Sequence, residues 1–178
     1  GKISADELDE MEQAACPGCG SCSGMFTANT MNCMAEVLGM ALPGNGTIPA
    51  ASFGARRRMA KEAGAAAVRL VKDNVRPRDI MTMKAFENAM SVDMTVGGSS
   101  NTVLHLTAIA YEAGLELPMK KFDEISAKTP YITKLSPGGT FHIQDLNEAG
   151  GMNAIMAELA KIGRIHKDAL TVTGPMGD

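Results

Sequence analysis

The sequence predicts an α/β fold that is helix-rich and layered, with a small and mostly parallel sheet. Apolar residues recur every three or four positions over most of the chain, which is the spacing of one face of a helix. Two short β-branched runs near the end of the chain flank a further helical stretch, as in a βαβ unit. The chain has 178 residues, 45% of them hydrophobic, which suits one domain with a core of ordinary size.

The first two thirds of the chain are expected to be a succession of helices. Ser4 and Glu7 form a capping-box pattern that begins a short acidic helix. Later helices are separated by glycine-rich loop signals, and they are expected over about 23–40, 52–72, 82–96, 102–113 and 119–128. In the helix over 52–72, the expected buried stripe consists of Met59, Ala63, Ala67 and Leu70.

The last third of the chain is expected to contain the sheet. Tyr131–Leu135 and Ala169–Thr173 have strand-forming residues, and one long helix is expected over about 143–162. Two strands joined by a helix predict parallel pairing. Because no internal repeat, low-complexity stretch or linker interrupts the chain, residues 1–178 are expected to form a single segment of one domain.

Composition excludes several classes of function. The net charge is −3 without a long basic run, which argues against a nucleic-acid partner. No apolar run approaches the roughly 20 residues that cross a bilayer, so no membrane partner is expected. The polar start of the chain has no signal-peptide pattern. All four cysteines lie between Cys16 and Cys33, a crowding that favours metal or catalytic thiols in a reducing compartment over a disulfide framework.

Cys16, Cys19 and Cys22 have the spacing of cysteines that hold an iron–sulfur cluster. A zinc site would need a second Cys or His pair, which the sequence lacks, and thiol–disulfide chemistry or plain packing remains an alternative for Cys16 and Cys19. Cys22 directly precedes a predicted helix, where free N–H groups stabilise a thiolate. Cys33 falls within the apolar stripe of that helix and is expected to be buried.

A second candidate site is the loop from Gly97 to Asn101, which opens onto a helix. Glycine N–H groups in such a loop can bind an anion, and Ser99 and Asn101 can bind a carboxylate or a hydroxyl group. The alternative is an ordinary capped helix start. His105, one turn further along, is expected to be a hydrogen-bonded core histidine.

The run from Cys16 to Met31 resembles the third cluster-cysteine region of the dehydratase family that acts on dihydroxy acids, 6-phosphogluconate and sugar acids. Leu42 to Gly46, Gly97 to Thr102 with His105, and Asp145 to Gly151 extend the resemblance over nearly the whole chain. The Cys-Pro-x-Cys lead-in and Gly24-Met25-Phe26 are most similar to the dihydroxy-acid branch.

The resemblance implies a lyase that converts 2,3-dihydroxy-3-methyl carboxylic acids to 2-oxo acids in valine and isoleucine biosynthesis. A [2Fe–2S] or [4Fe–4S] cluster would act as a Lewis acid on the 3-hydroxyl group, and Mg²⁺ would hold the carboxylate and 2-hydroxyl groups. Carried over to this chain, Cys22 is a cluster ligand, and Ser99 and Asn101 lie near the substrate. A sugar-acid or 6-phosphogluconate dehydratase is the alternative within the family.

The family's other two cluster cysteines, its Mg²⁺ ligands and its proposed serine base lie outside the matched region. The chain is therefore expected to be the second half of an N-terminal domain, cut from a cytoplasmic or organellar homodimer or homotetramer. Alone, it is expected to hold no stable cluster, to contain no catalytic residue and to have no activity. A stand-alone cysteine-loop metal-binding module is the alternative outside the family.

Overall fold

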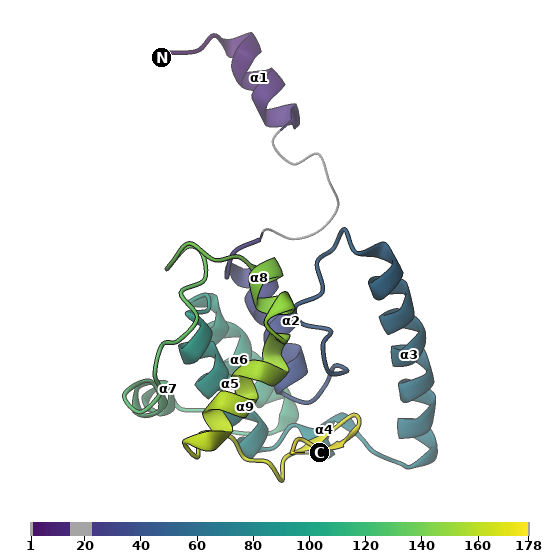
Figure 1. Ribbon diagram of the computed structural model, residues 1–178. Coiled ribbons are helices and arrows are strands. Elements are labelled where there is room, and N and C mark those ends of the chain that lie inside the picture. The colour runs from purple at the N-terminus through teal and green to yellow at the C-terminus, as the bar shows by residue number, and fades with distance from the viewer. Residues whose placement is uncertain (1, 15–22, 178) are drawn as a thin grey trace.

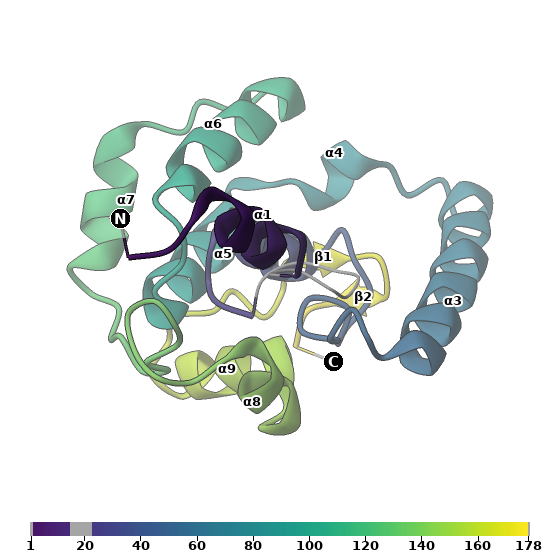
Figure 2. The ribbon, with the colours of Figure 1, turned by 90° about the horizontal axis from the view of Figure 1, so that it is seen from above.

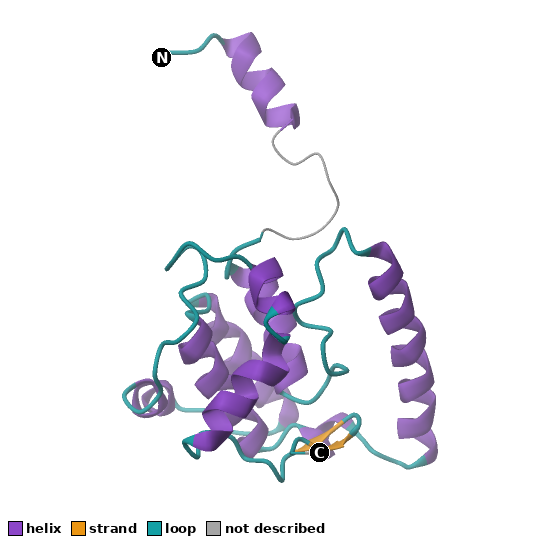
Figure 3. Ribbon diagram, viewed as in Figure 1, coloured by secondary structure: helices purple, strands orange, loops and turns teal. Residues whose placement is uncertain are grey.

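The structure is a computed structural model that describes residues 2–14 and 23–177 (Figure 1). Helices dominate the described residues, and the two short strands lie near the C-terminus (Figure 3). The elements are α1 (Ala5–Ala14), α2 (Thr27–Val37), α3 (Phe53–Lys72), α4 (Pro77–Ile80), α5 (Met83–Val96), α6 (Asn101–Ala113), α7 (Met119–Ser126), α8 (Ile143–Glu148), α9 (Gly151–Lys161), β1 (Leu170–Thr171) and β2 (Gly174–Pro175).

Most of the predicted helices are confirmed, and each of these begins within one or two residues of its predicted start. At α1 the capping box forms, since Ser4 N donates to Glu7 Oε2 (2.7 Å) and Glu7 N donates to Ser4 Oγ (3.2 Å). Helix α2 begins at Thr27, four residues later than predicted. The backbone groups of Ser23 and Met25, just before it, are hydrogen-bonded to Ile143 and Ser136 instead.

Helix α5 is the centre of the core. Helices α2, α6, α7 and α9 pack against it, and Figure 2 shows it between α6 and α7 on one side and α9 on the other. Apolar residues from four of these helices are fully buried at the contacts, including Met34, Phe86, Met90, Leu106 and Leu159. Methionine is well suited to such helix contacts because its flexible side chain fills irregular gaps.

Helix α3 stands beside this bundle (Figure 1), and its expected buried stripe is only partly correct. Met59 and Leu70 are half-buried, but Ala63 and Ala67 are exposed, and Ala66 is the buried alanine. The stripe lines a pocket of about 240 Å³ between α3 and residues 40–45. This face of the helix therefore lies against the residues that follow α2.

The α/β class with a small sheet is confirmed, but the expectation of parallel pairing is wrong for the described strands. β1 and β2 pair antiparallel, with Leu170 opposite Pro175 and Thr171 opposite Gly174. Gly174 has a φ of 123°, which a glycine adopts without strain, and the chain reverses just before it. The Thr171 hydroxyl closes the turn by donating to Gly174 O (2.8 Å).

The remaining elements of the predicted βαβ unit also differ. Residues 131–135 form no strand; Leu135 makes only an isolated bridge with Phe141. The predicted helix over 143–162 is two helices, because Gly150 (φ 108°) and Gly151 (φ 65°) have left-handed backbone conformations between α8 and α9.

Candidate functional site

The candidate loop, residues 97–101, lies against the first turn of α2, which directly follows the cysteine motif in the sequence. Asn101 Nδ2 donates to Thr27 Oγ1 (2.7 Å), and Thr27 Oγ1 also hydrogen-bonds with Ser99 Oγ (3.3 Å). Ser99 is half-buried and Asn101 is exposed, so both side chains are open to a ligand. The fold thus joins the two regions that the sequence marked separately.

The backbone of the loop is held by a second hydroxyl group of α2. Ser99 N donates to Thr30 Oγ1 (3.1 Å), and the Thr30 hydroxyl donates to Met25 O (3.2 Å). Thr30 is fully buried, which fixes the loop against α2 with little freedom. Ser99 Oγ also accepts from Asn101 N (3.3 Å) at the start of α6, so Ser99 supports the helix start as well.

The two glycines of the loop have different structural roles. Gly97 ends α5 with a left-handed conformation (φ 64°), and the ring of Tyr131 lies against it. A Cβ atom at Gly98 would lie 2.0 Å from Asp93 Oδ1, so the Gly98 backbone lies directly on that carboxyl group. Asp93 O also accepts a hydrogen bond from Gly98 N (3.0 Å).

Asp93 is a buried acid beneath the loop, and no pattern in the sequence indicates its role. It is 5% exposed and has no ion-pair partner among the described residues. Burial raises its pKa to about 7, an effect that the neighbouring Thr102 hydroxyl opposes. Its Oδ1 atom accepts no hydrogen bond of normal geometry from the described residues.

Residues 131–143, the bridging segment, connect the candidate loop to the end of the cysteine motif. Ile132 N donates to Thr95 O (3.1 Å) just before the loop. Further along, Met25 N donates to Ser136 O (2.6 Å), and Ile143 N donates to Ser23 O (2.8 Å). Backbone groups of the bridging segment at Ser136 and Ile143 therefore hold Met25 and Ser23 in position.

The predicted cluster ligand Cys22, together with Cys16 and Cys19, lies outside the described residues. The residues that follow it fit an anionic group, because no side chain caps the N-terminus of α2 at Phe26. The described part of the chain contains no group of three or more His, Cys, Asp or Glu side chains that could hold a metal ion.

Cys33 is buried, as predicted. It is fully inaccessible, its Sγ donates to Gly46 O (3.5 Å), and burial raises its pKa to about 12. A thiol that stays protonated is a poor metal ligand. His105, by contrast, is exposed on α6, so the expectation of a core histidine is wrong.

Sequence reasoning also missed Glu36, which holds the glycine-rich turn that follows α2. Its carboxylate accepts hydrogen bonds from Gly44 N (2.8 Å) and Gly46 N (2.6 Å). Burial raises the pKa of Glu36, and these two N–H groups oppose the rise. The residue types of such a turn are visible in the sequence, but the carboxylate that satisfies its N–H groups is not.

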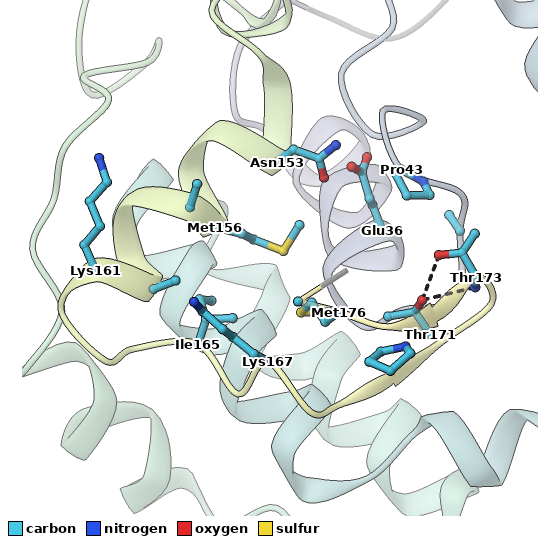
Figure 4. A pocket seen from close by; sticks show the side chains of 15 residues that line it. Glu36, Pro43, Asn153, Met156, Lys161, Ile165, Lys167, Thr171, Thr173 and Met176 are labelled. Carbon is cyan, nitrogen blue, oxygen red and sulfur yellow. Dashed lines mark hydrogen bonds between the residues drawn. The ribbon is translucent and has the colours of Figure 1, made fainter.

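Glu36 also lines a pocket of about 550 Å³ between the end of α2, α9 and the C-terminal hairpin (Figure 4). Asn153 and Met156 line it from α9, and Thr171 and Thr173 line it from the hairpin. Because Glu36 and Thr27 lie at opposite ends of α2, this pocket is separate from the candidate loop.

Comparisons with known proteins agree with the sequence resemblance. Residues 1–177 match the family described as dihydroxy-acid/6-phosphogluconate dehydratase N-terminal. Over 174 residues, the chain is 62% identical to the dihydroxy-acid dehydratases of Moorella thermoacetica and Caldicellulosiruptor saccharolyticus, and 59% identical to that of Oleidesulfovibrio alaskensis. Each match covers 98% of this chain and 31% of the relative, so the chain spans about a third of the length of these curated relatives.

No described helix is both long and apolar enough to span a lipid bilayer.

Proposed function

The chain belongs to the dihydroxy-acid/6-phosphogluconate dehydratase family, and on that premise we propose that it forms part of the cluster-binding N-terminal domain of a dihydroxy-acid dehydratase. Its substrates would be 2,3-dihydroxy-3-methyl carboxylic acids, which lose water to give 2-oxo acids in branched-chain amino-acid synthesis. The whole enzyme would be a homodimer or homotetramer in the cytoplasm, or in the matrix or stroma of an organelle.

One observation carries the proposal: the cluster of Thr27, Ser99 and Asn101 lies at the start of the helix that follows Cys22. A ligand held near Cys22 would meet the Ser99 hydroxyl and the Asn101 side-chain carbonyl. The described residues donate no hydrogen bond to Asn101 Oδ1, which leaves this atom available to accept one from a substrate hydroxyl.

Cys22 would provide one thiolate ligand to an iron–sulfur cluster, and the ligands of Mg²⁺ would lie outside this chain. When bound, these groups would supply Lewis-acid chemistry that stabilises the departing hydroxyl and the substrate carboxylate. The residues of this chain would bind and orient the substrate, and we assign no proton transfer to any of them. The uncapped first turn of α2 would favour the thiolate form of Cys22.

A chimaera tests the proposal. The matching region of the Moorella thermoacetica dehydratase is replaced by this chain, and the purified protein is assayed anaerobically with 2,3-dihydroxyisovalerate, 6-phosphogluconate and a sugar acid. We expect 2-oxo acid to form from the first substrate only, as in the unmodified relative. Preference for 6-phosphogluconate or the sugar acid would assign the chain to another branch of the family.

The isolated 178-residue chain tests the alternative of a stand-alone metal-binding module. After anaerobic reconstitution with iron and sulfide, we expect no stable visible absorption and no turnover, because the family resemblance makes Cys22 the one cluster ligand in this chain. A stable cluster on the isolated chain would instead favour the module.

A further inference from the structure

In the part of the chain that the structure describes, the candidate loop is flanked by buried polar atoms without a hydrogen-bond partner. Among the residues that the structure describes, three buried side-chain oxygens have no hydrogen-bond partner: Asp93 Oδ1, Thr95 Oγ1 and Thr102 Oγ1. Asp93 and Thr95 lie on the last turns of α5, and Thr102 lies on the first turn of α6. Buried polar atoms without partners are rare and tend to mark places where function imposes the arrangement.

Asp93 has the closest contact with the loop. The Gly98 backbone lies so near Asp93 Oδ1 that a Cβ atom would come within 2.0 Å of it, and Asp93 O accepts the hydrogen bond of Gly98 N. Ser99 N, one residue on, is fixed to Thr30 Oγ1. A shift of the carboxyl group would therefore shift the backbone that presents Ser99 and Asn101.

We propose that Asp93 is a positioning residue, which holds the candidate loop in its binding geometry through a buried carboxyl group that is protonated in that geometry. The inference rests on the proposed function, since it concerns the substrate loop of that enzyme. It assigns Asp93 no contact with the substrate.

The surroundings of Asp93 favour the neutral acid. Among the described residues, the Thr102 hydroxyl of α6 lowers its pKa and the Gly98 backbone lies against it, and neither group is titratable. No Lys, Arg or His of the described parts of α2, α6, α7 or α9 forms an ion pair with it. Its pKa of about 7 has burial as its main cause.

Ionisation of Asp93 would change this arrangement. A buried carboxylate needs hydrogen-bond donors, and without them its burial is strongly unfavourable. The nearest dipoles belong to the loop and to Thr102, so the charged form would be stabilised by turning their N–H or O–H groups toward it. Such movement separates Ser99 and Asn101 from Thr27 and weakens substrate binding above neutral pH.

The test uses the full-length chimaera and the isosteric variant Asp93→Asn. In the unmodified chimaera, we expect KM to rise several-fold as the pH is raised from below to above 7, while kcat changes little. In Asp93→Asn the KM should be nearly independent of pH over this range. Asp168→Asn, which changes an exposed carboxylate paired with Lys84, is the matched control and should keep the original profile.

Two further measurements keep the inference testable if activity is lost. Infrared spectra should show a protonated-carboxyl C=O band below pH 7 that disappears above it and is absent in Asp93→Asn, whether or not the chimaera is active. Thr102→Val should move the transition to higher pH, because it removes the group that lowers the pKa. A KM profile that Asp93→Asn leaves unchanged, or the absence of the infrared band, would overturn the inference, whereas an inactive chimaera that shows the band would overturn only the proposed function.

Discussion

Asn101 Nδ2 donates a 2.7 Å hydrogen bond to Thr27 Oγ1, although 74 residues separate the two in the sequence. The bond connects the first residue of α6 to the first residue of α2, and Ser99 shares the same hydroxyl group. Thr27 therefore organises both residues that the sequence marked as substrate-binding candidates.

Replacing Thr27 by valine removes this organising hydroxyl group while keeping the shape of the side chain. Since each lost hydrogen bond is worth about 0.5–1.5 kcal/mol, we expect kcat/KM of the full-length chimaera for dihydroxyisovalerate to fall roughly tenfold. Steady-state kinetics of the purified variant measure the effect. Thr107→Val is the matched control, because the Thr107 hydroxyl donates only to Val103 O within α6. Equal losses in the two variants would contradict a specific role for Thr27.

Gly98 allows the loop to lie on Asp93, and a methyl group there should not be tolerated. In Gly98→Ala the new Cβ would meet Asp93 Oδ1 at 2.0 Å and the Thr30 side chain at 2.8 Å. Overpacking of this kind costs about 1–3 kcal/mol, so the melting temperature should fall and substrate affinity should weaken.

Gly64→Ala provides the comparison for Gly98. Gly64 lies within α3, and a Cβ atom added there would have no neighbouring atom within 4 Å, so alanine should be accommodated. It should raise helix stability by up to about 1 kcal/mol. If the Gly98→Ala and Gly64→Ala proteins had the same melting temperature, the contact between residue 98 and Asp93 would be easily relieved.

Local patterns allowed the helices and the candidate loop to be predicted, because their signals are contained within a few residues. Glycine pairs, caps and apolar spacing place α5, α6 and the loop that carries Ser99 and Asn101. The roles of Thr27 and Glu36 could not be predicted, since each depends on a partner that only the folded chain brings near.

The strand predicted over 131–135 does not form, although its residue types favour one. Its β-branched residues fit a strand, but strand formation needs a neighbouring strand, and the backbone N–H of Ile132 is bonded to Thr95 O of α5 instead. Residue type alone does not distinguish a sheet strand from an extended segment that bridges two loops.

The raised pKa of Asp93 predicts how stability depends on pH. The native state keeps a proton on this group up to about pH 7, whereas the unfolded state loses it near the ordinary value of 3.8. Native Asp93 therefore binds more protons over this interval, and its contribution to stability falls as the pH rises from 3.8 through 7 and is constant above.

Asp93→Asn should remove this dependence. Relative to the unmodified chimaera, the variant should gain stability between about pH 4 and pH 8, by at most roughly 4 kcal/mol. Melting temperatures of both proteins across this range measure the difference. If the difference in melting temperature between the two proteins were the same at every pH, Asp93 would have an ordinary pKa in the folded protein.

Cys22 and Cys33 should differ completely in their effect on a cluster. In the full-length chimaera, Cys22→Ser should abolish the visible absorption of the reconstituted cluster together with activity, because a serine hydroxyl replaces a thiolate ligand poorly. Cys33→Ser should keep the absorption, since the buried Cys33 thiol bonds to Gly46 O and remains protonated. It should lower the melting temperature instead, because a hydroxyl group is less favourable than a thiol at a fully buried position. Iron content and absorption spectra of the two variants decide the matter: a cluster retained in Cys22→Ser, or lost in a folded Cys33→Ser protein, would show that the ligand has been assigned to the wrong cysteine.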